Sequence, residues 1–244
     1  IGFMVIVGWA ADLEYLKRLV AGQVAMNSAT ALGFILCGAS LWQLRSGERG
    51  PQHALRVARC CAVLVVMLAL LRIGGYAFGT DPYVDQLLFR GRTTVEENRM
   101  APNTALAFFF VGLALTLLVT DFAYRFRLAQ CLLLATALLA LLALVGYAYS
   151  IAFLYRMPNF IPMALNTALA FLVLCAGIVC TYPHRGPMAI VVSENGGGVI
   201  ARRLLPAAVL LPLALGALVL AGQRAGVYDP PMPFALLTVL NMAM

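Results

Sequence analysis

A nine-residue sequence motif, the repeat phrase, occurs three times in this chain. Each copy stands at the beginning of a long apolar segment. The copies cover residues 26–34, 100–108 and 163–171 and share the pattern M-x-x-[N/A]-T-A-L-x-F. Self-similarity of this kind is typical of proteins that stack one repeated supersecondary unit. Because each apolar run has the length of a helix, we predict that the unit is a helical hairpin and that the phrase marks one end of it.

The composition is typical of a membrane protein. Hydrophobic residues make up 63% of the chain and charged residues 11%, with a mean hydropathy of +0.92. A soluble domain carries about 25% charged residues. The apolar runs extend for about 20 residues, which at 1.5 Å per residue matches the hydrocarbon core of a bilayer. Since backbone groups find no water in lipid, the runs must be helical. We therefore predict an all-α, polytopic membrane bundle.

We expect about eight transmembrane helices in a single domain, residues 1–244. The first and last apolar segments are too short to span a bilayer, so we expect the chain to be a fragment whose terminal helices continue beyond it. The segments cover approximately residues 1–11, 24–44, 58–78, 102–120, 128–150, 162–181, 204–222 and 232–244. They pair into hairpins at about 1–44, 58–120, 128–181 and 204–244.

One stretch has the pattern of strands. Residues 189–193 and 199–203 are rich in β-branched side chains, and the intervening Glu-Asn-Gly-Gly-Gly is typical of a turn. We predict a small cytoplasmic β-hairpin over residues 189–203.

The basic residues predict the orientation. Loops on one side of the predicted bundle hold nine Lys or Arg against three acids, and those on the other hold seven against seven. The more basic side is expected to be cytoplasmic. The net charge of +7 then faces anionic lipid, and we infer no nucleic-acid binding from it. Expected partners are membrane lipids, with other membrane subunits or a second copy as further possibilities.

In this topology all three phrases lie at the outer face. Asn103 and Asn166 are predicted N-caps, and Ser28 is the candidate cap in the first copy, where Ala29 replaces the asparagine. One interpretation is that the phrase serves only packing and capping. The other is that three helix N-termini converge on a pocket for a polar or anionic ligand. The candidate ligand or packing residues are Thr30, Met100, Asn103, Thr104, Met163, Asn166 and Thr167.

Arg72 is the ionisable residue within a predicted span. A charge there is costly unless its side chain reaches the interface or finds a partner. Either Arg72 extends to the interface, or it faces the bundle interior and pairs with a ligand or with Asp81 or Asp85. The predicted spans contain no acidic residue, which weakens the case for an ion pump.

Motifs for catalysis or cofactor binding are absent from the sequence. Both histidines fall in predicted loops, and the six cysteines show no C-x-x-C spacing, so neither haem nor a metal site is expected. We predict no catalytic residue, metal ligand or cofactor, and leave lipid or pigment contact open. Any enzymatic activity would belong to a domain outside these residues.

Several blocks of the chain resemble the N-terminal integral-membrane module of bacterial sensor proteins, which precedes PAS, histidine-kinase or diguanylate-cyclase domains. The chain departs from that pattern at Ala29. The resemblance implies a multi-pass, periplasm-facing sensor region in a bacterial inner membrane. Such a region relays a signal to a cytoplasmic output domain, as in two-component systems. The blocks are Gly-Trp-Ala-Ala-Asp at 8–12, then 24–26 and 30–34, 85–89, 99–105, 162–168, 201–206 and 222–226.

Two other classes of protein fit the same sequence. A non-catalytic structural or accessory subunit of a larger membrane complex would also lack catalytic residues. A small-solute transporter would need a polar cavity reaching the middle of the bilayer. The sequence leaves the ligand, the output domain and the oligomeric state open.

Overall fold

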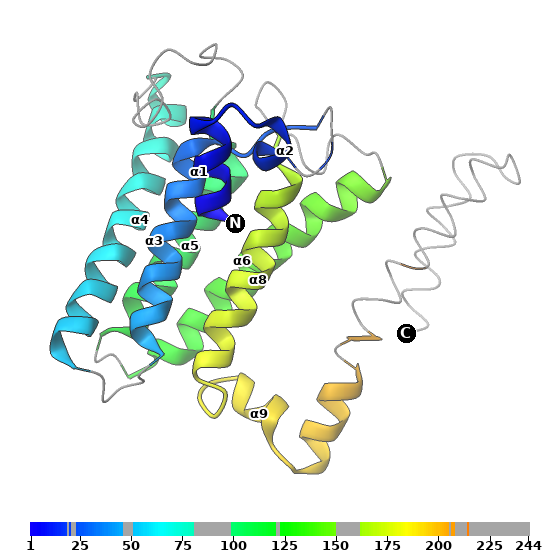
Figure 1. Cartoon of the computed structure of the whole chain (residues 1–244). Helices are drawn as coiled ribbons and strands as arrows, with labels where there is room; N and C mark the ends of the chain where they lie inside the picture. The colour runs from blue at the N-terminus through cyan, green and yellow to red at the C-terminus, as the bar shows by residue number, and fades with distance from the viewer. Residues whose placement is uncertain are drawn as a thin grey trace, which may run out of the picture. The chain divides into compact units, whose positions relative to one another are not determined.

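The structure, a computed structural model, describes residues 1–18, 20, 23–45, 51–80, 99–120, 123–149, 162–204, 206, 207 and 214. Within these residues all regular structure is helical, which confirms the predicted all-α class (Figure 1). The helices are α1 (Gly2–Ala10), α2 (Glu14–Lys17), α3 (Ser28–Leu44), α4 (Gln52–Phe78), α5 (Pro102–Leu118), α6 (Arg125–Tyr149), α8 (Leu165–Thr181) and α9 (Met188–Val192).

The chain divides into two compact units, of which the first comprises Ile1–Met188. In this unit α3, α5 and α8 contact one another, while α4 packs against both α3 and α5, α6 against both α5 and α8, and α1 against α3. The unit therefore contains three hairpins, α1–α3, α4–α5 and α6–α8, whose second helices form the centre. The three second helices begin at the same end of the bundle (Figure 1).

All three repeat phrases adopt one local geometry. The N-caps are Asn27, Ala101 and Ala164, each directly after the methionine of the phrase, with φ of −64°, −62° and −66° and ψ of 147° in every case. The repeated sequence therefore adopts the same backbone conformation before each of the helices α3, α5 and α8.

The predicted N-caps were wrong, because each observed N-cap lies one or two residues earlier in the sequence. Asn103 and Asn166 are the second residues of α5 and α8, and Ser28 is the first residue of α3. In α5 the first helical position is Pro102, where a missing N–H is harmless, so the cap must be the residue before it. Of the three caps, only Asn27 uses its side chain, which accepts hydrogen bonds from two backbone N–H groups.

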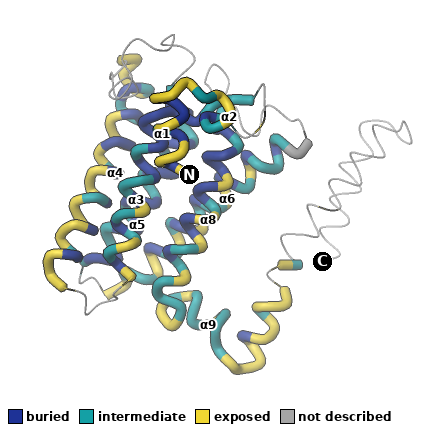
Figure 2. The backbone as a smooth tube through the Cα atoms, in the orientation of Figure 1, coloured by how far each residue is buried: buried dark blue, intermediate teal, exposed yellow. Residues whose placement is uncertain are grey.

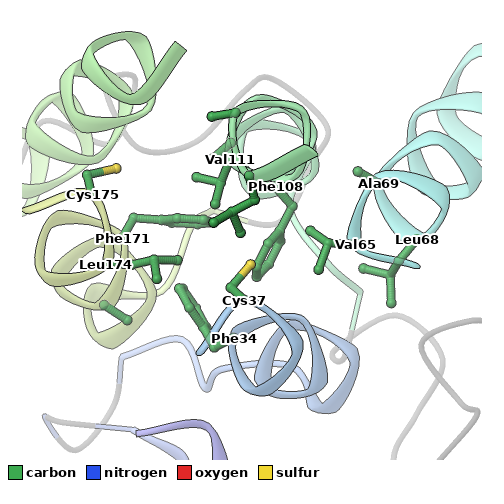
Figure 3. Close-up of a cluster of buried hydrophobic side chains, with 14 of the residues drawn as sticks. Phe34, Cys37, Val65, Leu68, Ala69, Phe108, Val111, Phe171, Leu174 and Cys175 are labelled. Atoms are coloured by element: carbon green, nitrogen blue, oxygen red, sulfur yellow. The ribbon is translucent and has the colours of Figure 1, made fainter. Parts of the chain in front are cut away.

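A triad of phenylalanines fills the space between the three central helices (Figure 3). Phe34, Phe108 and Phe171, the last residues of the three phrases, are all buried. Their ring centroids lie 5.0, 4.7 and 4.8 Å apart, with interplanar angles of 57° to 63°. Tilted and edge-to-face contacts at these distances are favourable for aromatic rings. The repeat therefore builds its own core, one ring from each hairpin.

Two helices of the described chain, α4 and α6, are long and apolar enough to cross a membrane. The central helices α3, α5 and α8 are apolar but have 17 residues each, which corresponds to about 25 Å. The predicted segments at 204–222 and 232–244, and with them the hairpin 204–244, lie largely or wholly outside the described residues. Large hydrophobic side chains are exposed on the outer helices α4 and α6 (Figure 2), among them Leu64, Met67, Leu71, Leu134 and Leu138.

The predicted β-hairpin over 189–203 was wrong. The second unit begins at Ala189, and residues 189–192 and 196–204 are helical. The N–H groups of Gly198 and Val199 both donate to the Asn195 carbonyl, which starts a helical turn where a strand reversal was expected. The Arg202 guanidinium donates to the Val191 and Ser193 carbonyls. β-Propensity depends on a neighbouring strand for its effect, and local helical bonds prevail here.

Candidate functional site

A small pocket lies where α3, α5 and α8 begin. Its volume is about 10 Å³, which is room for roughly one water molecule. All three repeat phrases contribute to its lining, together with Arg99 from the segment ahead of α5. The polar side chains around it come from Asn27, Thr30, Arg99, Thr104 and Thr167. The structure thus brings together residues that are more than 130 positions apart in the sequence.

Three equivalent threonines dominate the pocket. Thr30, Thr104 and Thr167 each occupy the third position of their helix and are only 2%, 2% and 1% exposed. Their backbone N–H groups donate to the side-chain oxygens of asparagines at 3.3, 3.0 and 3.1 Å. All three residues line the pocket. A threonine hydroxyl can donate one hydrogen bond and accept others, so each can contact a ligand there.

The predicted asparagines have a different role. Neither Asn103 nor Asn166 is among the residues that line the pocket. Their side-chain oxygens accept from the neighbouring threonine N–H groups, and the Asn166 amide donates to the Lys17 carbonyl at 3.0 Å. These amides orient the helix starts. Two methionines were among the predicted site residues. Met100 lines the pocket, whereas Met163 is fully buried and is not part of the lining.

The electrostatic character of the pocket is positive. Three helix N-termini each present the equivalent of roughly half a positive charge. Arg99 adds a guanidinium group to the lining. None of the eleven described residues that line the pocket is acidic. The described lining can therefore donate hydrogen bonds to an electron-rich atom.

Each central helix start is held by an aromatic side chain from the first helix of the same hairpin. Trp9 Nε1 donates to the Met26 carbonyl at 2.9 Å, and the Tyr147 hydroxyl donates to the Met163 carbonyl at 2.7 Å. The Tyr76 hydroxyl donates to the carbonyl of the third methionine, Met100. One aromatic donor per hairpin thus fixes the backbone next to each N-cap.

Sequence reasoning missed these donors, but the sequence contains a signal for them. Each belongs to a Gly-[Trp/Tyr]-Ala triplet, at residues 8–10, 75–77 and 146–148. The glycine is buried in all three copies. The repeat unit therefore has a second, shorter phrase at the end of its first helix.

Replacing Tyr147 with phenylalanine is expected to lower the free energy of unfolding by about 1 to 3 kcal/mol, because the Met163 carbonyl loses a hydrogen bond inside the protein. Thermal unfolding of the detergent-solubilised protein measures this. Tyr15 is exposed, so Tyr15→Phe is the matched control and is expected to melt like the parent. An unchanged melting temperature for Tyr147→Phe would contradict the proposed fixing role.

Arg72 lies inside the bundle. The residue is only 2% exposed. Its Nη2 donates to the Tyr76 hydroxyl at 3.0 Å, and its guanidinium carbon lies 4.9 Å from the centre of that ring. Arg72 therefore supports the aromatic donor of the second hairpin. Asp81 and Asp85, its predicted partners, lie outside the described residues.

Lys17 forms a second polar centre that sequence reasoning missed. Its side chain is buried, ion-paired with Asp12 and Glu14 at 2.5 and 2.9 Å, and lies 4.6 Å from the Trp9 ring centre. Burial acts to lower the pKa of Lys17, but hydrogen bonds to the two carboxylates outweigh it and leave the pKa above its ordinary 10.5. The hydrogen bond from Lys17 likewise holds the pKa of Glu14 below its usual value. The ammonium therefore stays charged.

The Lys17 backbone links this centre to the first and third phrases. Its carbonyl accepts from the Met26 N–H at 2.9 Å and from the Asn166 amide at 3.0 Å. Two helix starts are thus tied to the short α2 segment.

Comparison with known proteins finds no match to any family model, curated protein or solved structure. Within the described residues no group of three or more His, Cys, Asp or Glu side chains could hold a metal ion. The site is therefore interpreted from its own geometry.

Proposed function

We propose that this chain is the membrane sensor module of a bacterial signal-transduction protein, with the pocket as its ligand site. The observation that carries the proposal is the convergence of three equivalent helix starts on one positive pocket, with three buried threonine hydroxyls lining it. A phrase that served capping alone would not need a threonine at the pocket in every copy. The resemblance to sensor modules supports the same interpretation.

The proposed setting is the bacterial inner membrane. The two long apolar helices and the exposed apolar side chains on α4 and α6 are consistent with lipid contact. The distribution of basic residues in the loops favours an orientation with the pocket facing the periplasm. In this proposal the chain crosses the membrane several times and contacts lipids, and a cytoplasmic kinase or cyclase domain supplies the output.

The mechanism follows from where the ligand binds. A ligand in the pocket touches α3, α5 and α8 at once, and each belongs to a different hairpin. Binding shifts the population toward the hairpin packing that the ligand contacts best. Because each helix is a rigid rod, a change at its start also moves its opposite end. The hairpins are thus the elements through which a signal reaches the output domain.

The test uses the full-length protein in cells, with the activity of its output domain as the readout. Thr30→Val with Thr167→Val removes two pocket hydroxyls at nearly constant volume. Allosteric coupling of the usual size predicts a change of about 5-fold or more in output per molecule of folded protein. Thr136→Val is the matched control, because Thr136 is buried in α6 and donates to its own helix at the Leu132 carbonyl.

Output that stays the same in the pocket variant and in Thr136→Val would overturn the sensor proposal. Membrane abundance and melting temperature are measured for both variants, so that a folding defect is recognised. If the double variant folds poorly, Arg99→Gln serves as the second variant and carries the same expectation.

A further inference from the structure

The end of the first unit that lies away from the pocket is rich in arginine. Helices α3, α5 and α8 end there, and α4 and α6 begin there (Figure 1). We call this region the basic end and define it as residues 40–45, 51–60, 117–120, 123–130 and 181–188. These residues include no aspartate or glutamate and six arginines, which are Arg45, Arg56, Arg59, Arg125, Arg127 and Arg185.

The pocket end treats its cations differently. There Lys17 is ion-paired with Asp12 and Glu14, and Arg18 is ion-paired with Glu14. The described residues of the basic end offer no carboxylate for such a pair. An anion that approaches the basic end therefore meets charges of one sign.

Two of the six arginines serve the fold. Arg59 Nη2 donates to the Val119 carbonyl at 3.0 Å. Arg125 Nη1 donates to the Thr120 carbonyl at 2.6 Å. Both contacts lie at the end of α5, where the helix dipole favours cations. That explanation fails for Arg127, the third residue of α6, because the dipole disfavours a cation at a helix start. An anion bound beside Arg127 would relieve this repulsion.

Exposed apolar side chains begin directly beside the exposed arginines. On α4, Arg56 is followed by Val57 and, two turns later, by Leu64, and all three are exposed. On α6, the exposed Arg127 is followed by Leu128, which is 45% exposed. A change from guanidinium groups to apolar side chains along the same helix fits the boundary between lipid headgroups and acyl chains.

The end of α3 has the same character. Trp42 is 64% exposed, and the guanidinium carbon of Arg45 lies 4.3 Å from the centre of its ring. Tryptophan is enriched where a membrane meets water. Three helices, α3, α4 and α6, thus each place an exposed arginine next to an exposed apolar or aromatic side chain.

We infer that the basic end is a binding surface for anionic phospholipids. Headgroup phosphates pair with Arg45, Arg56 and Arg127, while acyl chains cover the exposed apolar side chains of α4 and α6. Guanidinium groups match phosphate oxygens in bidentate hydrogen bonds. Lipid is favoured over free phosphate because free phosphate would leave the apolar side chains in water. The inference rests on the proposed membrane setting and adds the class of lipid that the protein selects.

Lipid binding by the purified, detergent-solubilised protein tests the inference. Native mass spectrometry measures the apparent Kd for phosphatidylglycerol, which is anionic, and for phosphatidylcholine with the same acyl chains, which is zwitterionic. A basic side chain near an anionic lipid surface contributes about 5-fold in affinity. We therefore expect phosphatidylglycerol to bind at least about 5-fold more tightly than phosphatidylcholine.

The variants locate the effect. Arg45→Gln, Arg56→Gln and Arg127→Gln combined should abolish most of the preference for phosphatidylglycerol. Lysine at the same three positions keeps the charge and should keep most of the preference, so it keeps the inference testable if the glutamine variant does not fold. Arg18→Gln removes an arginine from the pocket end and should leave the preference unchanged.

Two outcomes would overturn the inference. Equal affinity for the two lipids would mean that the basic end does not select anionic headgroups, and a preference that persists in the glutamine variant would place the anionic lipid elsewhere. The sensor proposal fails separately. Lipid preference with unchanged signalling in the pocket variants retains the lipid surface and rejects sensing, whereas altered signalling without lipid preference does the opposite.

Discussion

Replacing Phe108 with alanine is expected to lower the free energy of unfolding by about 3 to 5 kcal/mol. The ring has no exposed surface, and its centroid lies 5.0 Å from that of Phe34 and 4.8 Å from that of Phe171. It therefore contacts both other hairpins. The backbone of α3 also lies close to this ring, because a Cβ added at Gly33 would be 2.8 Å from it. Truncation opens a cavity in the core between the three hairpins.

Chemical and thermal unfolding of the detergent-solubilised protein measure this loss. Phe78→Ala is the matched control, since Phe78 ends α4 with 83% of its surface exposed and its removal should leave stability nearly unchanged. A similar loss for both variants would mean that the phenylalanine triad is not the centre of the fold.

The central helices could be predicted from the sequence because each has an internal marker. Helices α3, α5 and α8 correspond to the predicted apolar segments 24–44, 102–120 and 162–181. The repeat phrase forms the first turn of each helix. The outer helix α4 was predicted to begin at residue 58 and begins at Gln52. Charged side chains near that end were taken as a boundary, although a helix can continue through arginines that extend to water.

The interactions that fix the pocket could not be predicted, because each joins residues that are distant in the sequence. The Asn166 amide, for example, reaches the Lys17 carbonyl across 149 positions. Periodicity predicts which face of a helix is apolar but not which partner it meets. The aromatic donors were missed for the same reason, although their Gly-[Trp/Tyr]-Ala triplets are visible in the sequence.

The candidate site was predicted in part. The sequence places Thr30, Thr104 and Thr167 in the same register of the phrase, and the structure places them together. The sequence does not indicate Arg99 as a site residue, because it precedes the phrase, and the equivalent positions in the other copies hold Ala25 and Pro162. The positive charge of the pocket thus comes from a position that the repeat does not share.

Gly112→Ala is expected to destabilise the protein by about 1 to 3 kcal/mol, whereas the same change at the equivalent Gly38 should not. Both glycines follow the phenylalanine of their phrase by four residues. A Cβ at Gly112 would lie 2.8 Å from a methyl carbon of Val66 and 3.1 Å from the Val66 backbone nitrogen. Helix α4 therefore packs directly against the backbone of α5 at this point, and an added methyl group would push the two helices apart.

Gly38 provides an internal control because nothing lies within 4 Å of its added Cβ. Alanine is a better helix former than glycine, so Gly38→Ala should stabilise α3 by up to about 1 kcal/mol. The two substitutions are chemically identical and occupy one register of the repeat, so their opposite signs in a melting experiment would isolate the effect of helix contact. Equal effects at the two sites would mean that α4 does not pack closely on α5. In that case α4, the helix that carries Arg72 and Tyr76, would not lie beside the start of α5.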